Sequence, residues 1–410
     1  MNRSPDDNPF RPGAGAVPEV WVGRADLLPL YEQERKDRTR GRYTSGTVFI
    51  GPSGIGKSVL INRFAQRAGS DGDIVLEAVR VAKRSDPVAH LAGAVAKARD
   101  HVAGDGNLVD AIEATLGRLQ VISVKGFRFS VEQEGIANPH LVVRDSLIGL
   151  GVTLAKENAT RGVDRQRALV VRIDELQNAD NEQRSKVLSA LGDVLEHEIE
   201  LPTSDGTGTT ITQHLPVLLY VTGLPDLLNR ATNVDTFRRR FSTIPLGVFT
   251  DAEVVDALID TPMPHGVAFT RAAAEALATV VAGDPFLFQL VGKHTWDASA
   301  GDEITVDDVA RADEATYSER LRTVEAAAAD IPDGEARVLH AIYELADERL
   351  EVRGAQVADR LAKTPAQIAT AAQRLERRAA IRRVRGIWRV EHRLLHRYLS
   401  TGDIVPSNRG

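Results

Sequence analysis

The sequence has no cysteine, two methionines and only 5% aromatic residues among its 410 positions. The lack of cysteine excludes disulfides, thiolate metal sites and a cysteine nucleophile, and it suits a reducing compartment, so we expect a cytoplasmic protein. No uninterrupted apolar run reaches the ~18 residues of a membrane span. The opening segment MNRSPDDNPFRPGAGAVP lacks the apolar stretch of a secretory signal. We therefore expect no membrane partner.

The chain also lacks a strong charge of one sign. Its 51 Lys and Arg against 57 Asp and Glu leave a formal net charge of -6, so bulk charge does not indicate a nucleic-acid binder, although a local basic patch is compatible with it. A hydrophobic content of 43% excludes wholesale disorder, and the length predicts two or three domains. Frequent Ala, Leu, Glu and Arg indicate that helices dominate.

The strongest motif is GPSGIGKS, which follows a short β-rich run at residues 47–50 and precedes a helical pattern. It fits the phosphate-binding loop G-x-x-x-x-G-K-[ST], whose glycines let backbone N–H groups surround phosphates at a helix N-terminus. The alternative is a glycine-rich turn at a strand–helix joint. We expect Lys57 to reach the β and γ phosphates and Ser58 to bind Mg²⁺. The expected nucleotide-binding residues of this loop are Gly51, Pro52, Ser53, Gly54, Ile55, Gly56, Lys57 and Ser58.

Two acids, Asp174 and Glu175, end the apolar run RALVVRID. Ligands gather at the carboxyl ends of strands in open α/β sheets, so we expect Asp174 to hold Mg²⁺ and Glu175 to act as the general base on the attacking water. The alternative is a solvated acidic pair at a strand end. Thr222 ends the run VLLYVT, where its hydroxyl could bond the γ-phosphate or that water, or where it simply suits a strand end. Arg172 interrupts its strand and either faces outward or pairs with an acid.

A run of three arginines, Arg238, Arg239 and Arg240, offers an arginine finger for a neighbouring subunit's γ-phosphate. The alternative is a solvated basic helix end, and the sequence does not choose among the three residues. A finger in trans would require a homo-oligomer, which we keep as an open expectation.

The remaining pattern predicts the order of elements. Strands are expected at residues 47–50, 167–174 and 217–222, which carry the motifs, and at 73–79 and 243–248. A hairpin is expected at 119–131. Helices are expected from 22–28 to about 34, at 86–118, at 141–159 and from Asp174 to near Glu200. The polar segment at 201–216 predicts a loop or mobile hairpin. After residue 250 the pattern is helical, with capping pairs Thr250–Glu253 and Thr305–Asp308 and a helix boundary at 283–285.

The last part of the chain predicts a winged helix. Helices are expected at 334–347, 355–362 and 364–379, followed by two short strands that turn at Gly386. Residues 374–397 contain nine arginines against two glutamates, a local net charge of +7. This favours contact with the phosphates of double-stranded DNA. The alternatives are a solvated arginine-rich surface, or a wing that packs on the rest of the chain or on a protein partner.

Taken in order, these motifs resemble P-loop ATPases of the AAA+ superfamily. More narrowly, the chain is similar to STAND-type and origin-recognition-initiator-like ATPases, and to bacterial ATP-binding proteins that open with NPFRPGAG and carry an IDELQ Walker B motif. The resemblance implies that Val22, Gly23 and Arg24 lie near the adenine and that Pro285, in GDPF, belongs to the G-x-P motif of STAND proteins. The chain departs from other AAA+ proteins in having no clear sensor-2 arginine, and Lys293 and His294 are not assigned that role.

The resemblance implies an α/β fold with a parallel five-stranded P-loop NTPase core, a helical lid and a winged helix. It predicts an N-terminal arm and adenine-side box at 1–45, the ATPase core at 46–249, the lid at 250–330 and the winged-helix domain at 331–410. It implies ATP and Mg²⁺, since no guanine-specific N-K-x-D motif follows the strands. Three functions stay open: a slow ATPase that acts as a conformational switch, an ATP-gated DNA-binding regulator or loader, and a protein-interaction switch in signalling or defence.

Overall fold

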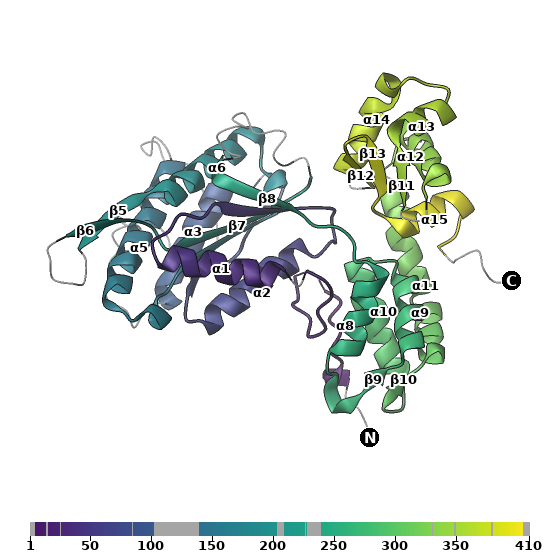
Figure 1. Cartoon of the computed structure of the whole chain (residues 1–410), viewed down its shortest axis with the longest axis horizontal. Coiled ribbons are helices and arrows are strands. Elements are labelled where there is room, and N and C mark those ends of the chain that lie inside the picture. Colours follow the sequence, from purple (N-terminus) through teal and green to yellow (C-terminus); the bar gives the residue numbers. More distant parts are fainter. Residues whose placement is uncertain are drawn as a thin grey trace. The chain divides into compact units, whose positions relative to one another are not determined.

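The computed structural model describes residues 5–13, 15–24, 26–83, 85–101, 139–202, 209–225, 227, 239–329, 331–347, 350–378 and 380–404 (Figure 1). By their contacts they divide into two compact units. The sheet unit comprises Ala25–Ile50 and Leu60–Pro245, and the helical unit comprises Met1–Arg24, Gly51–Val59 and Leu246–Gly410. Within the described residues, no helix is both long and apolar enough to cross a membrane.

The sheet unit is built on a parallel sheet. Its strands are β1 (Gly46–Ile50), β2 (Ile74–Val75), β3 (Val79–Arg80), β4 (Leu169–Asp174), β7 (Val217–Gly223) and β8 (Phe241–Pro245). Their order is β2-β4-β7-β1-β8, and β3 also pairs with β4. Since β2 pairs with the first half of β4 and β3 with its end, these two strands share one edge position. The five parallel strand positions expected from the sequence are therefore confirmed.

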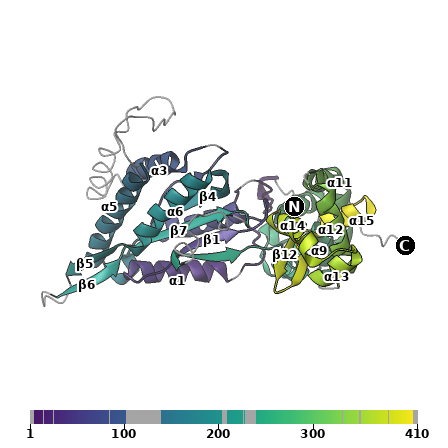
Figure 2. The same ribbon diagram turned by 90° about the horizontal axis from the view of Figure 1, so that it is seen from above.

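Helices cover both faces of this sheet. Figure 2 shows α3 (Pro87–His101), α5 (Pro139–Thr160) and α6 (Asn181–Glu196) over one face and α1 (Leu27–Thr39) over the other. On the α1 side, Phe49 and Tyr220 stack with each other, and both pack on Phe64 of α2 (Lys57–Ser70). On the opposite side, Val48 and Leu219 join the large apolar core. Because both faces are covered, the strands are almost continuously apolar.

Several predicted boundaries differ from the structure. The first helix runs to Thr39 rather than to about Glu34, because Arg38 is fully buried and donates to the carbonyl of Leu195, 3.0 Å away. The helix after β4, α6, ends at Glu196 rather than near Glu200, because a strand begins at Glu198.

The segment predicted as a loop or mobile hairpin contains an antiparallel hairpin. Its strands are β5 (Glu198–Pro202) and β6 (Thr210–His214). The fifth central strand lies two residues earlier than predicted, in register with β1. The hairpin predicted at 119–131, and the predicted helix beyond residue 101, lie outside the described residues.

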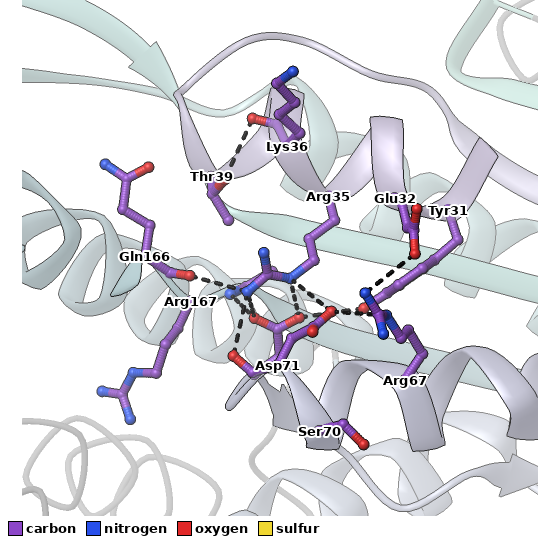
Figure 3. Close-up of polar contacts among 12 residues, drawn as sticks. Tyr31, Glu32, Arg35, Lys36, Thr39, Arg67, Ser70, Asp71, Gln166 and Arg167 are labelled. Atoms are coloured by element: carbon purple, nitrogen blue, oxygen red, sulfur yellow. Dashed lines mark hydrogen bonds and ion pairs between the residues drawn. The ribbon is translucent and has the colours of Figure 1, made fainter. Parts of the chain in front are cut away.

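A polar network joins α1, the end of α2 and the start of β4 (Figure 3). Asp73, whose side chain has 0% exposure, accepts from the Arg35 guanidinium at 2.7 and 2.9 Å and from the backbone N–H of Ala168 at 2.8 Å. Arg35 also donates to the Gln166 carbonyl at 3.1 Å. Burial and the neighbouring Asp73 carboxylate raise the pKa of Tyr31, so this phenol stays protonated. The network fixes α1 against the edge of the sheet.

In the helical unit, four helices form the lid. They are α8 (Asp251–Asp260), α9 (Arg271–Val281), α10 (Pro285–Ala298) and α11 (Val306–Ala329), with η4 (Pro264–Gly266) and the short parallel pair β9 (Ala268–Phe269) and β10 (Glu303–Ile304). The predicted capping box of Thr250 and Glu253 is present, and Asp308 accepts from the Thr305 N–H. The N-terminal arm, with η1 (Pro5–Asp7), belongs to the same core, where Phe10 packs edge-on against Phe288.

The C-terminal part has the element order of a winged helix. It comprises α12 (Asp333–Leu345), β11 (Glu351–Arg353), α13 (Gly354–Arg360), α14 (Pro365–Arg377), β12 (Ile381–Val384), β13 (Ile387–Val390) and α15 (Arg393–Thr401). The antiparallel sheet has the order β11-β13-β12. The three predicted helices and the turn at Gly386 are confirmed, whereas β11 and α15 were not predicted.

We predict that Asp73→Ala lowers the free energy of unfolding by about 3 kcal/mol, because it leaves Arg35 and the Ala168 N–H without their buried acceptor. The measurement is urea unfolding followed by circular dichroism. Asp71→Ala is the matched control, since Asp71 lies two residues away and its bridges to Arg35 and Arg67 span 3.8 and 3.4 Å at the surface. Its cost should stay below about 1 kcal/mol. Equal losses in the two variants would contradict the prediction.

Candidate functional site

The phosphate-binding motif forms a glycine-rich loop that leaves β1 and opens α2 at Lys57. Gly54 and Gly56 have φ angles of 79° and 86°, a backbone region that side chains with a Cβ rarely adopt. Ile55 is buried and anchors the loop. The Lys57 ammonium is also buried, and it donates to the carbonyls of Gly51 and Pro52 at 3.0 and 2.6 Å. The lysine is thus held over the loop by the loop's own backbone.

Arg24 ties the N-terminal box to this loop. Its guanidinium donates to the carbonyl of Ile55 and, at 3.4 Å, to that of Gly56. Its other side lies 5.2 Å from the ring centre of Phe249, at the start of the lid. Desolvation by burial lowers the pKa of Arg24 to about 10, against the opposing effect of the Glu253 carboxylate, so the side chain remains a cation near neutral pH. The adenine-side role of this box stays a prediction.

The other predicted box and lid residues lie in the same unit. Val22 is buried in the lid core, and a Cβ on Gly23 would come within 2.7 Å of a Glu253 carboxylate oxygen. Pro285 is the first residue of α10, and Asp284 before it caps that helix by accepting from the N–H groups of Phe286 and Leu287. The carbonyl of Gly283 accepts from the Phe249 N–H at 2.9 Å. The GDPF motif therefore joins the start of α8 to the start of α10.

Asp174 and Glu175 lie at the carboxyl end of β4, and Thr222 lies near the end of the neighbouring β7. Thr222 is fully buried. Its hydroxyl donates to the Asp174 carboxylate at 2.5 Å and accepts from the Glu175 N–H at 3.0 Å. The structure therefore brings these three predicted residues together. Thr222 here holds the two acids, and its predicted contact with phosphate or water stays a prediction.

Glu175 has an unusual backbone. Its φ and ψ of 59° and 38° lie in the left-handed region, which is costly for a residue with a Cβ and recurs at functional sites. The turn η3 (Leu176–Asn178) follows it, and the amide of Gln177 donates to the Glu175 carboxylate. Sequence reasoning gave Gln177 no role, although it belongs to the IDELQ motif.

Arg172 resolves one alternative left open by the sequence. It is buried, and it donates to the Asn62 side chain at 2.7 Å and to the Leu76 carbonyl at 3.1 Å, so it neither faces outward nor forms an ion pair with an acid within the described residues. Burial lowers the pKa of Arg172, and Asp174 acts in the opposite direction. This arginine links β4 to α2 and to the segment after β2.

The three candidate fingers differ in their surroundings. Arg240 forms ion pairs with Asp193 and Glu196 of α6 at 2.9 and 2.7 Å. Burial acts to lower the pKa of Arg240, but the two acids together outweigh it and raise that pKa. Arg239 is exposed, and Arg238 lies outside the described residues. Arg240 is engaged within its own chain. Of the two arginines that the structure describes, Arg239 is therefore the better candidate for a contact with a neighbouring subunit.

The arginine-rich winged helix is more neutral than its local sequence suggests. Arg374 and Arg378 pair with the buried Glu335, which lies outside the counted window. Three further arginines also pair with acids: Arg382 with Glu391, Arg383 with Glu376 and Arg393 with Asp251. Arg385 and Arg389 are exposed and form no ion pair with a residue that the structure describes. Acids of the same chain therefore pair with at least five of the nine arginines, and Arg385 and Arg389 are exposed cations on the β12–β13 hairpin.

The few protein ligands near the end of β4 are compatible with Mg²⁺ bound partly by phosphates and water. No three His, Asp or Glu side chains gather as ligands in the part of the chain that the structure describes. Mg²⁺ commonly binds through one or two carboxylates, with substrate phosphates and water as its remaining ligands. Asp174 has a carboxylate of this kind, and the roles of Asp174 and Ser58 as Mg²⁺ ligands stay predictions.

Comparisons with known proteins give a fold but no family. No protein family and no curated protein matches the sequence. A solved structure of the Walker-type ATPase of Pyrococcus abyssi aligns over 93% of this chain and 96% of that one, with a TM-score of 0.56 and 13% identity. The Aeropyrum pernix Orc1 protein in complex with DNA aligns over 94% of both chains at 14% identity and a TM-score of 0.44.

The Thermotoga maritima RuvB Holliday junction branch migration motor aligns over 96% of this chain and 100% of that one, at 15% identity and a TM-score of 0.39. The argument for the fold rests on the Walker-type ATPase, whose TM-score exceeds 0.5. Together with the strand order and the loop after β1, that likeness confirms the expected α/β fold of a P-loop ATPase. The predicted resemblance to ATPases with a phosphate-binding loop is thus shown at the level of the fold, and the narrower resemblance to AAA+ ATPases stays a prediction.

Proposed function

We propose that this protein binds ATP with Mg²⁺, hydrolyses the ATP slowly and uses the nucleotide state to change the conformation of its lid and winged helix. The observation that carries the proposal is the loop at residues 51–58, with positive φ at Gly54 and Gly56 and the buried Lys57 ammonium at the start of α2. Such a loop presents backbone N–H groups and a cation to phosphates. The fold of the Walker-type ATPase supports the same assignment.

Hydrolysis is assigned to the acids at the end of β4. Asp174 would hold Mg²⁺, which when bound neutralises charge on the phosphates. Glu175 would take a proton from the attacking water as general base. Thr222 supports both roles, since its one hydroxyl bonds the Asp174 carboxylate and the Glu175 backbone. Arg239 is proposed as the residue that could complete a neighbour's site in an oligomer.

The switch is supported by a continuous set of contacts within the helical unit. Arg24 holds the loop carbonyls and lies against Phe249. The carbonyl of Phe249 accepts from Arg393 of α15 at 3.3 Å, and Arg393 also pairs with Asp251 at 2.9 Å. We propose that a change at the phosphate loop reaches the winged helix through Arg24, Phe249 and Arg393.

A second candidate function is binding of double-stranded DNA by the wing. The observation that favours it is the exposed pair Arg385 and Arg389, on the β12–β13 hairpin, next to the exposed side chains of Val384 and Ile387. Cations at a wing suit phosphate contact more than base recognition. The intramolecular pairing of five neighbouring arginines argues for fewer phosphate contacts than the sequence suggests. A protein partner at the same hairpin is the competing proposal.

We predict that Lys57→Ala and Glu175→Gln separate binding from turnover. Lys57→Ala should weaken ATP binding by about 1.5–3 kcal/mol or more, because it removes the loop's only cationic side chain. Glu175→Gln should bind ATP like the parent but hydrolyse it about 10²–10⁴-fold more slowly. Calorimetry and a phosphate-release assay give the two quantities. Parental turnover in Glu175→Gln would exclude Glu175 as the base, and parental affinity in Lys57→Ala would exclude the loop as the binding site.

We predict that Arg393→Ala uncouples the winged helix from the phosphate loop. The measurement is hydrogen exchange over α12 to β13 with ATP and with ADP, using Glu175→Gln as the background so that ATP persists. The difference between the two nucleotides should shrink in Arg393→Ala while ATP still binds. Arg397→Ala is the matched control, because Arg397 lies in the same helix and donates to the Ile404 carbonyl. An undiminished difference in Arg393→Ala would contradict the proposed route.

For the wing, we predict that Arg385→Ala combined with Arg389→Ala weakens binding to all duplex sequences alike. It should flatten the slope of log affinity against log salt by about 1.8, since each lost phosphate contact contributes about 0.9. The assay is a titration of labelled duplex at several salt concentrations.

The charge-matched control for the wing is Arg360→Ala with Arg383→Ala, whose side chains pair with Glu344 and Glu376. Its slope should stay close to that of the parent. Absence of duplex binding by the parent in both nucleotide states would favour the protein partner.

A further inference from the structure

Gln177 lies between the proposed general base and the end of a neighbouring strand. Its side-chain N–H donates to Oε2 of Glu175, and its side-chain oxygen accepts from the backbone N–H of Leu224 at 3.3 Å. Leu224 directly follows β7 and lies two residues beyond Thr222. Thus the end of β7 holds Glu175 in two ways: Thr222 holds its backbone N–H, and Leu224 holds its carboxylate through Gln177.

The backbone conformation of Glu175 indicates that its neighbours hold this residue in place. A residue with a Cβ is strained in the left-handed region and persists there only where the surroundings impose it. The turn η3 that follows returns the chain so that Gln177 meets Glu175. The buried Leu176 anchors this turn, and Asn178 donates to the Val81 carbonyl at 2.9 Å. Both the first and the last residue of the turn are thus attached to the sheet unit.

We propose that Gln177 is a positioning residue for the hydrolysis assigned above. Its amide donates to one oxygen of the Glu175 carboxylate, which fixes the carboxylate's orientation and leaves the other oxygen to accept a proton from water. The same bond makes the orientation of Glu175 depend on the segment after β7, since Leu224 fixes the Gln177 amide. This inference rests on the proposed role of Glu175 as general base.

The test is a double-mutant cycle measured by steady-state ATP turnover. Gln177→Met keeps the side-chain length and removes both hydrogen bonds. We expect kcat to fall about 10- to 10²-fold with little change in KM, because a misplaced catalytic group costs up to about 10² in rate. In the Glu175→Gln background the same change should cost nothing further, since Gln177 acts only through Glu175. A purely structural role would give equal losses in both backgrounds.

Two further variants keep the test decisive. Asn178→Ala is the matched control in the same turn, because it removes a bond to Val81 and not to Glu175, and its kcat should stay within a few-fold of the parent. If Gln177→Met does not fold, Gln177→Glu replaces it, since it retains an acceptor for Leu224 and exchanges the donor to Glu175 for a second carboxylate that repels Glu175. Its kcat should fall as in Gln177→Met.

The outcomes separate this inference from the proposed function. If Glu175→Gln turns ATP over at the parental rate, Glu175 is not the base and both proposals fail. If Glu175→Gln loses turnover while Gln177→Met keeps the parental kcat, the base is upheld and the positioning role is rejected. Losses that add in the cycle also reject it.

Discussion

Parallel pairing of β1, β4 and β7 is the constraint on which the rest of the site depends. Parallel strands all point the same way, so their carboxyl ends meet at one edge of the sheet, and each crossover returns the chain to the other edge. The phosphate loop leaves β1, the acids end β4, and Thr222 lies at the end of β7. Two short segments, far apart in sequence, therefore suffice to bring Asp174, Glu175 and Thr222 together.

Because this end of the sheet is buried, its polar side chains need hydrogen-bond partners. Thr222 and Asp174 lie among strands that are apolar on both faces, where a polar side chain without a partner costs about 1–3 kcal/mol. The Thr222 hydroxyl meets that demand by donating to Asp174 and accepting from Glu175. A threonine fits both requirements of the position, because its branched Cβ suits a strand and its hydroxyl both donates and accepts.

The sequence predicted what local chemistry determines and missed what distant partners determine. The strands, the loop glycines and the Thr250–Glu253 cap depend on residues close in sequence, and they were found. The pairing of Arg374 and Arg378 with Glu335 was missed, because these partners lie about forty positions apart and no local pattern joins them. For the same reason Arg240 stayed one of three candidate fingers, whereas Asp193 and Glu196 hold it.

Charge counted along a sequence therefore overstates the field that a partner meets. The +7 of residues 374–397 falls once Glu335 and Asp251 are included, while Arg385 and Arg389 are exposed and form no ion pair with a described residue. Salt screens charges beyond about 8–10 Å, so it is such local charge, and not the chain total, that sets the attraction for phosphates.

The contacts of the phosphate loop suggest what could orient the exposed cations of the wing. By their contacts, residues Gly51–Val59 group with the helical unit, whereas β1 belongs to the sheet unit. Arg24 carries its charge against the loop carbonyls and the ring of Phe249, and a cation at such a site is costly to leave without acceptors. A shift of the loop carbonyls must therefore either move Arg24 or leave its charge without acceptors. Either change acts on Phe249, whose carbonyl accepts a hydrogen bond from Arg393. Because coupling between sites is reciprocal, whatever the wing binds would also change the affinity of the loop for its nucleotide.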